Sequence, residues 1–383
     1  MREISLLDII KKEIHKSDEK FISFRDFMNM ALYYPSLGYY TSSKDKVSEY
    51  GDFITATSQT SIFATVFANQ FADVLKKLGK DSNIVEFGAG TGKFAVDCMN
   101  ELNRLNVLPQ KYFIIELSND LKFRQQAYIK EHVPENLQDK FIWLTELPKE
   151  QIKGVIFANE VLDAMPVDIF RKSDTKIFQQ GVSISEGELK LIDLPINDKR
   201  FSSEIDKVLA DGITFSEDYT SELNTWIKPW IKSISEALKQ GVVFLCDYGY
   251  HRSLYYLPER NMGTLACYYR HKVNYDPFLN IGEQDITAHV DFTSVAEAVN
   301  DCEFEIEGYM TQANFLKRAN VSEIFLEIRK RLDQKYLAKY SQDLKELLLG
   351  DKLAETFKVF CFSRGVDEIL EVFDNDDNLD YLL

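Results

Sequence analysis

Three glycines stand at alternate positions in the stretch IVEFGAGTGKFAVDCM, which spans residues 84–99. They are Gly88, Gly90 and Gly92, and Glu86 lies two residues before the first of them. A strand that ends in glycines just before a helix offers a ligand unpaired backbone N–H groups and a partial positive charge. Glycine also permits positive φ angles and a close approach to the backbone. The stretch therefore predicts a nucleotide-binding turn, with an ordinary glycine-rich turn as the alternative.

The neighbouring residues exclude two phosphate-binding motifs. The dinucleotide fingerprint G-x-G-x-x-G needs glycine at its sixth position, where this chain has Lys93. A Walker A loop needs Ser or Thr after Gly-Lys, but Phe94 follows here. It also needs a glycine five positions before Gly92, and Gly88 stands only four positions before it. The ligand predicted from these residues is therefore neither a dinucleotide nor a nucleoside triphosphate.

The pattern that does fit is E-x-G-x-G-x-G, and it resembles motif I of the class I S-adenosylmethionine-dependent methyltransferases. That cofactor carries no phosphate, and Glu86 is an acid that can help to bind its ammonium group. A second acid, Glu116, follows the next predicted strand and is expected to hold the ribose hydroxyls. The expected cofactor is S-adenosyl-L-methionine. Its expected binding residues are Glu86, Gly88, Ala89, Gly90, Gly92, Glu116, Leu117, Ser118 and Asn159, with Asp52 and Phe53 as a lid or a plain turn.

A wider resemblance covers residues 20–363. It is carried in order by LGYY (37–40), GDFITA (51–56), FANEVLDAMPVDIF (157–170), DYG (247–249), GTLACYYRHKV (263–273), GEQDITAHVDF (282–292) and TQANFL (311–316). These segments resemble the MidA family of methyltransferases, whose mitochondrial members are complex I assembly factors that methylate an arginine of a complex I subunit. The chain departs from the family at Thr57-Ser58, where Pro-Glu is frequent, and at Ala89 and Thr91 within motif I.

Candidate catalytic residues follow the predicted fourth strand. Methyl transfer from a sulfonium requires donor and acceptor in line, and a guanidinium is a poor nucleophile unless carboxylates orient it and help remove a proton. Asn159, Glu160 and Asp163 lie where such a strand ends beside the ligand. Glu160 is expected to clamp the guanidinium, with the other two assisting. The alternatives are that Asp163 caps a helix and that Glu160 is a solvated loop acid.

The segment GEQDITAHVDF supplies the last candidate residues. Asp285 is expected to bind substrate or to belong to a lid, and His289 is either a base near neutral pH or a packed loop histidine. The order of acids and histidine is not a known metal-ligand spacing, so no metal is expected.

Alternating apolar strands and amphipathic helices predict an α/β fold with a parallel sheet. The resemblance implies a Rossmann-like, seven-stranded class I methyltransferase core with N-terminal helices and a smaller inserted substrate-side region. The expected division is 1–57 for the N-terminal helices and lid loop and 58–383 for the core, with insertions at 171–222 and 251–290. Four details are predicted: a Ser23 helix cap, a helix ending at Gly79, a turn at Glu186-Gly187, and a helix over 222–240 interrupted at Pro229.

The composition of the chain limits the kinds of partner that it is expected to bind. The 383 residues carry a net charge of −16, which disfavours nucleic acid and suits a basic, arginine-containing protein substrate or simply a soluble surface. No apolar run is long enough for a membrane span, and the N-terminus lacks a signal-peptide pattern. Five cysteines without a C-x-x-C spacing favour a reducing compartment, so a cytoplasmic location is expected. Oligomeric state is not predicted.

The functional prediction is methyl transfer to a protein arginine, of the respiratory complex I subunit type. Two alternatives stay open: an assembly or chaperone factor on a methyltransferase fold with little turnover, and a small-molecule methyltransferase. A dehydrogenase is disfavoured because Lys93 breaks the dinucleotide fingerprint.

Overall fold

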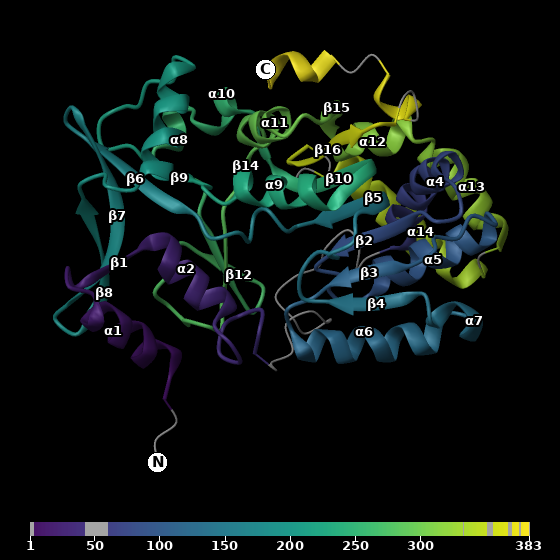
Figure 1. Cartoon of the computed structure of the whole chain (residues 1–383), viewed down its shortest axis with the longest axis horizontal. Coiled ribbons are helices and arrows are strands. Elements are labelled where there is room, and N and C mark those ends of the chain that lie inside the picture. The colour runs from purple at the N-terminus through teal and green to yellow at the C-terminus, as the bar shows by residue number, and fades with distance from the viewer. Residues whose placement is uncertain are drawn as a thin grey trace.

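A computed structural model describes residues 4–42, 60–331, 333–350, 355–366, 370–374 and 377–382. Its centre is a sheet with seven strands in the order β15-β16-β10-β5-β2-β3-β4 (Figure 1). Their bounds are β2 (Asn83–Phe87), β3 (Tyr112–Ile115), β4 (Phe141–Leu144), β5 (Ile152–Asn159), β10 (Leu238–Tyr250), β15 (Glu305–Thr311) and β16 (Phe357–Arg364). Five neighbouring strands, β4, β3, β2, β5 and β10, run parallel to one another. The strand β16 lies between β10 and β15 and runs antiparallel to both. The predicted seven-stranded core is confirmed, and β14 (Val290–Asp291) extends it beside the end of β10.

Helices cover both faces of this sheet. One face packs against α4 (Ser61–Leu78), α5 (Lys93–Arg104), α6 (Asn119–His132), α7 (Glu135–Gln138), α12 (Gln312–Arg318), α13 (Val321–Arg331) and α14 (Gln334–Leu349). The other face packs against α9 (Ile227–Ala237) and α11 (Phe292–Asp301). Because β5 is covered on both sides, residues 154–158 are buried without a break, as expected for a central parallel strand. The short η3 (Asp377–Tyr381) contacts β15, and η2 (Glu371–Phe373) lies against α12 and β15.

The N-terminal helices and the first insertion build a second lobe. The strands β6 (Asp168–Ser173), β7 (Lys176–Ser185), β8 (Glu188–Leu194) and β9 (Thr220–Leu223) join β1 (Phe21–Ser23) in an antiparallel sheet, with α8 (Lys199–Ala210) before β9. The helices α1 (Leu6–Lys16) and α2 (Phe24–Tyr33) share a hydrophobic cluster with these strands. Figure 1 shows this lobe to one side of the central sheet. The N-terminal helices thus pack on the insertion rather than on the central sheet.

The second insertion is more regular than its sequence predicts. It contains α10 (Arg252–Tyr255), η1 (Pro258–Arg260) and a small sheet of β11 (Ala266–Tyr269), β12 (Lys272–Asn274) and β13 (Asp285–Thr287). The antiparallel pairing of β13 with β11 joins residues almost twenty positions apart, which no local pattern indicates. This sheet brings residue 285 toward the core.

Local predictions are confirmed at two helix ends and one turn and are wrong at one helix. Ser23 caps α2 by accepting the Asp26 N–H at 3.0 Å, and α4 ends at Gly79. The β7–β8 turn holds residues 186 and 187 at φ 55° and 83°, as a two-residue hairpin requires.

The helix predicted over 222–240 is shorter at both ends. Residues 220–223 form β9 because they pair with β6, and residues from 238 onward belong to β10. Pro229 does not interrupt α9, since it stands in the first turn, where backbone N–H groups need no helical partner.

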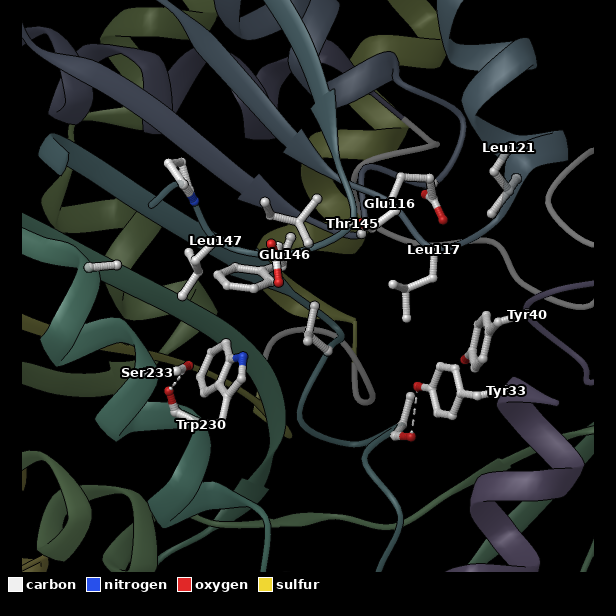
Figure 2. Close-up of a pocket in the computed structure, with 18 of the residues that line it drawn as sticks. Tyr33, Tyr40, Glu116, Leu117, Leu121, Thr145, Glu146, Leu147, Trp230 and Ser233 are labelled. Carbon is white, nitrogen blue, oxygen red and sulfur yellow. Dashed lines mark hydrogen bonds between the residues drawn. The ribbon is translucent and has the colours of Figure 1, made fainter. Parts of the chain in front are cut away.

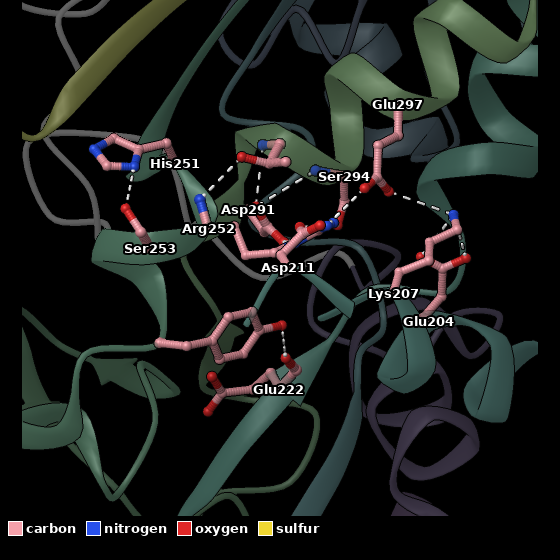
Figure 3. Close-up of polar contacts among 12 residues, drawn as sticks. Glu204, Lys207, Asp211, Glu222, His251, Arg252, Ser253, Asp291, Ser294 and Glu297 are labelled. Carbon is pink, nitrogen blue, oxygen red and sulfur yellow. Dashed lines mark hydrogen bonds and ion pairs between the residues drawn. The ribbon is translucent and has the colours of Figure 1, made fainter. Parts of the chain in front are cut away.

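Buried polar contacts attach the insertions to the core (Figure 3). The Arg252 side chain is 3% exposed, and its guanidinium pairs with Asp291 at 3.2 Å, with Glu297 at 2.6 Å and with Asp211. Asp211 follows α8 and Glu297 lies on α11, so one guanidinium links the first insertion to a core helix. Removing one partner of such a buried set is costly, which favours a fixed position for the inserted region. No helix in the described ranges is both long and apolar enough to cross a bilayer.

Candidate active site

A cavity of about 700 Å³ lies at the carboxyl ends of β2, β3, β4 and β5, where α/β sheets bind their ligands (Figure 2). Its wall combines strand ends, the loop after β4, the helix α9 and the N-terminal segment. Figure 2 shows Tyr33 and Tyr40 on one side and Trp230 and Ser233 on the other. The lining residues are Tyr33, Tyr40, Phe87, Gly88, Gly90, Ile115, Glu116, Leu117, Leu121, 145–149, Glu160, Val161, Ala164, Trp230, Ser233, Glu236 and Ala237.

The glycine turn forms part of this wall as predicted. Gly88 and Gly90 line the cavity with φ angles of 61° and 53°, in the left-handed region that favours glycine. A β-carbon at Gly90 would meet no atom of another described residue within 4 Å apart from its chain neighbours, so among the described residues the backbone there is open to a ligand. Gly92 instead begins α5, and Ala89 packs into the hydrophobic core beside α4 and α5.

Glu86 lies beneath the turn and does not line the cavity. In β2, Val85 and Phe87 pack on the α9 side of the sheet, so the alternation of side chains directs Glu86 to the opposite face. Its carboxyl is buried and accepts the Tyr112 hydroxyl at 2.7 Å. Burial raises the pKa of Glu86 to about 8, and the bond from Tyr112 opposes this rise. Its contact with a cofactor stays a prediction.

Glu116 stands at the end of β3 in the cavity wall, as predicted. Its carboxylate accepts the Ser118 N–H at 2.8 Å and the Gln125 amide at 2.9 Å. Burial raises its pKa, and these hydrogen bonds oppose that rise. Ser118 caps α6, and the Leu117 side chain is exposed at the cavity.

Gln125 belongs to the site, although the sequence did not predict it as a site residue. It is fully buried, and its amide nitrogen donates both to Glu116 and to the Gly90 carbonyl at 3.0 Å. Its amide oxygen accepts the Trp143 indole N–H at 2.8 Å. One side chain on α6 therefore ties the acid at the end of β3 to the glycine turn after β2. The hydrophobic periodicity of α6 does not indicate this role, because a glutamine in a helix is normally expected to be exposed to solvent.

We expect Gln125→Leu to weaken S-adenosylmethionine binding about tenfold, because leucine leaves the Glu116 carboxyl, the Gly90 carbonyl and the Trp143 indole without their partner. Isothermal titration calorimetry measures the change. Gln138→Leu is the matched control, since the Gln138 amide also donates to two carbonyls, at 2.8 and 3.1 Å, but beyond the end of α6. An affinity of Gln125→Leu within twofold of the wild type would contradict the assigned role.

The end of β5 presents Glu160 to the cavity. Its backbone N–H continues the ladder by donating to the Cys246 carbonyl at 2.9 Å, and its φ of 52° then turns the chain. The carboxyl accepts the Asn159 amide at 3.0 Å. Burial, with Asp163 and Asp285 nearby, raises the pKa of Glu160 to about 8. Glu160 is thus not a solvated loop acid.

Two further predicted acids lie behind this wall. Asp163 is 4% exposed and accepts the Tyr248 hydroxyl, and burial raises its pKa to about 6. It caps no helix, because a turn follows it. Asp285 on β13 accepts the Tyr40 hydroxyl at 2.9 Å, across 245 residues of sequence.

Tyr33 and Tyr40, which the sequence reading did not select, complete this side of the cavity. Their rings stack 5.4 Å apart, and the Tyr33 hydroxyl donates to the Ala164 carbonyl at 3.0 Å. They join α2, the loop after β5 and β13 into one wall.

His289 lies away from the cavity. His289 packs against the rings of Tyr248 and Tyr250, at 5.2 and 5.5 Å, and burial lowers its pKa to about 4. That environment favours the packed histidine over a base near neutral pH. Asp52 and Phe53 lie outside the described residues. Within the described ranges, no group of His, Cys, Asp or Glu is arranged to hold a metal ion.

The cavity wall fits the groups of S-adenosylmethionine. The open backbone at Gly88 and Gly90 can accept a close ligand, and the Glu116 carboxylate can hold ribose hydroxyls. Asn159 does not line the cavity, and its buried Oδ1 accepts no hydrogen bond in the described part of the chain, so its contact with a cofactor stays a prediction. The fold and this donor set define a class I S-adenosylmethionine-dependent methyltransferase.

Comparison with known proteins gives the family. A family model described as "Putative S-adenosyl-L-methionine-dependent methyltransferase" matches residues 66–310. The chain belongs to this family, which is the MidA family that its sequence resembles, and the expected cofactor is thereby confirmed.

The matched relatives cover nearly the whole chain. A crystal structure of a Burkholderia thailandensis protein bound to S-adenosyl-homocysteine is 32% identical and superposes with a TM-score of 0.88, covering 97% of this chain and 95% of that one. "Protein arginine methyltransferase NDUFAF7 homolog, mitochondrial" of Caenorhabditis elegans is 24% identical and covers 91% of this chain and 85% of its own length. The Homo sapiens protein arginine methyltransferase NDUFAF7 is 24% identical, with coverages of 89% and 79%.

Proposed function

We propose that the protein transfers a methyl group from S-adenosylmethionine to the guanidinium of an arginine in a protein partner. The observation that carries this proposal is the Glu160 carboxyl in the cavity wall, with Asp163 and Asp285 close behind it. When bound, the cofactor supplies an electrophilic methyl group on a sulfonium. The protein must therefore supply a place that orients the acceptor nitrogen and makes it nucleophilic.

Glu160 has the chemistry for that task. A carboxylate can bind a guanidinium through two parallel hydrogen bonds, which fixes the plane of the acceptor. The same carboxylate can take the proton that a guanidinium nitrogen must lose, and its raised pKa of about 8 suits that transfer near neutral pH. Asn159 orients one Glu160 oxygen from below, through the bond of 3.0 Å. The stacked Tyr33 and Tyr40 give the cavity an aromatic side against which a guanidinium can pack.

Two further observations support a protein arginine as acceptor. The Caenorhabditis elegans and Homo sapiens relatives, each 24% identical to this chain, are named protein arginine methyltransferases. The net charge of −16 attracts a basic partner rather than a nucleic acid. A respiratory complex I subunit is the protein that the family resemblance suggests first.

The experiment is to incubate the full chain with S-adenosylmethionine radiolabelled on its methyl group and a protein extract from the source cells, and then to locate the labelled residue by mass spectrometry. Label on arginine supports the proposal. Label on another residue or on a small molecule overturns the acceptor. No label despite cofactor binding by calorimetry favours an assembly factor with little turnover.

A further inference from the structure

Asp247, near the carboxyl end of β10, is fully buried and gathers backbone N–H groups from the turn after β5. Its Oδ2 accepts the N–H groups of Val161 at 3.1 Å, Leu162 at 2.9 Å and Asp163 at 3.3 Å. Its Oδ1 accepts the N–H of Tyr248 at 3.0 Å. Three successive N–H groups converge on one carboxylate oxygen, an arrangement typical of a backbone nest around an anion.

This arrangement begins one residue after Glu160. Glu160 has a φ of 52°, in the left-handed region where a residue other than glycine is strained. Such strain persists only where the surrounding structure enforces it. The bonds from residues 161–163 to Asp247 hold the chain immediately beyond the strained position. Burial and the nearby Asp163 and Glu160 raise the pKa of Asp247, and the bonds from the backbone of residues 162 and 163 oppose that rise.

A second contact secures the same turn. The hydroxyl of Tyr248, the neighbour of Asp247, donates to the Asp163 carboxylate. The end of β10 therefore holds the turn after β5 in two ways. It bonds to the main chain of the turn through Asp247 and to an acidic side chain of the turn, Asp163, through Tyr248. The Asp247 carboxylate itself does not line the cavity, so it does not reach a ligand there.

We propose that Asp247 is a positioning residue for methyl transfer. It holds the Glu160–Asp163 turn so that the Glu160 carboxyl faces the cavity, and it acts through Glu160 rather than on the reactants. This inference rests on the proposed function only in the role given to Glu160. The hydrogen bonds of the Asp247 carboxyl go to residues 161–163 and 248 and not to the glycine turn or Glu116, so its loss should affect turnover rather than cofactor binding.

The test compares Asp247→Asn, Glu160→Gln and the double variant. Initial rates of label transfer from radiolabelled S-adenosylmethionine into extract protein are measured at saturating cofactor, and cofactor affinity is measured by calorimetry. Asp247→Asn keeps the size of the side chain but replaces one acceptor oxygen by an NH₂ group. We expect its rate to fall about 30-fold and its cofactor affinity to stay within threefold of the wild type. When Asp247→Asn is added to Glu160→Gln, the further fall in rate should be less than threefold, because the two substitutions remove the same function.

A matched control separates positioning from stability. Asp198→Asn alters another carboxylate that accepts successive N–H groups, those of Arg200 at 2.8 Å and Phe201 at 3.5 Å, at the start of α8 and away from the cavity. We expect its rate to stay within threefold of the wild type. A loss as large as that of Asp247→Asn would reduce Asp247 to a general structural role and overturn the inference.

The outcomes distinguish the inference from the proposed function. If Glu160→Gln keeps the wild-type rate, the role of Glu160 fails. If Glu160→Gln loses activity but Asp247→Asn does not, or if their effects multiply, the role of Asp247 fails. Should Asp247→Asn not fold, amide hydrogen exchange of the wild type decides: residues 161–163 must be protected with or without cofactor, and exchange at the rate of exposed amides overturns the inference.

Discussion

Replacement of Glu160 by glutamine is expected to lower methyl transfer 100- to 1,000-fold while cofactor affinity stays within threefold of the wild type. The amide can accept one hydrogen bond from a guanidinium, but it carries no charge and cannot take a proton. The loss corresponds to about 3–4 kcal/mol of transition-state stabilisation. Initial rates with labelled cofactor give the first quantity, and calorimetry gives the second.

The raised pKa of Glu160 adds a pH dependence with a defined sign. Because that pKa is about 8 in the free protein, the carboxyl is mostly neutral at pH 7. A guanidinium binds its ionised form, so binding of the acceptor releases a proton below pH 8. The KM for the acceptor should therefore fall as pH rises from 7 to 8 and level off above that. Glu160→Gln should show no such change over the same range.

Stability supplies an internal check on this variant. A glutamate whose pKa rises on folding from 4.5 to about 8 makes the folded state less stable as pH increases between those values. Glu160→Gln removes this loss, so the variant should be at least as stable as the wild type at pH 8, by thermal unfolding. A reduced rate therefore cannot be assigned to unfolding.

Glu186→Gln is the matched control for this change. Glu186 is also a glutamate with positive φ, 55° against 52°, but it stands in the exposed β7–β8 turn. The rate of methyl transfer by Glu186→Gln should equal that of the wild type. If Glu160→Gln itself keeps more than a third of the wild-type rate, the guanidinium clamp is wrong.

The parts of the site that sequence predicts are those whose signal is local. The glycine turn and the acid at the end of β3 follow directly from a strand-turn-helix order, and the structure places Gly88, Gly90 and Glu116 in one cavity wall. Glu160 could be predicted because the ends of parallel strands share one edge of the sheet.

Contacts between distant segments could not be predicted in this way. Tyr40 meets Asp285 across 245 residues, and Asp247 meets Leu162 across 85. Hydrophobic periodicity carries no information on such pairs. The only sequence cue was that the segments LGYY and DYG, which contain Tyr40 and Asp247, belong to the family resemblance.

Glu86 shows that a motif can name the right ligand while leaving a residue's place open. Its order before the glycines suggests contact with the cofactor, but the two-residue period of β2 puts it on the face opposite Phe87, which does line the cavity. Counting that alternation from the apolar residues of the strand would have indicated burial. The carboxyl instead bonds to Tyr112 under the turn.

Gly90→Val is expected to weaken S-adenosylmethionine binding at least 100-fold. Gly90 lines the cavity at a φ of 53°, where a β-branched residue is strained. Among the described residues beyond its chain neighbours, none has an atom within 4 Å of the added β-carbon, so the side chain would occupy space that the ligand needs. Calorimetry with S-adenosylmethionine measures the loss, and methyl transfer should fall with it.

Gly187→Val separates backbone strain from loss of the binding surface. Gly187 also has a positive φ, 83°, and its added β-carbon would likewise meet no atom within 4 Å in the described part of the chain beyond its neighbours, but it lies in the β7–β8 turn of the second lobe. Both variants carry the same kind of backbone strain, so both should lower the thermal midpoint. Only Gly90→Val should lose cofactor binding, because only there does the open space belong to the cavity. Unchanged cofactor affinity in Gly90→Val would mean that the glycine turn is an ordinary β–α connection and that the cofactor binds elsewhere.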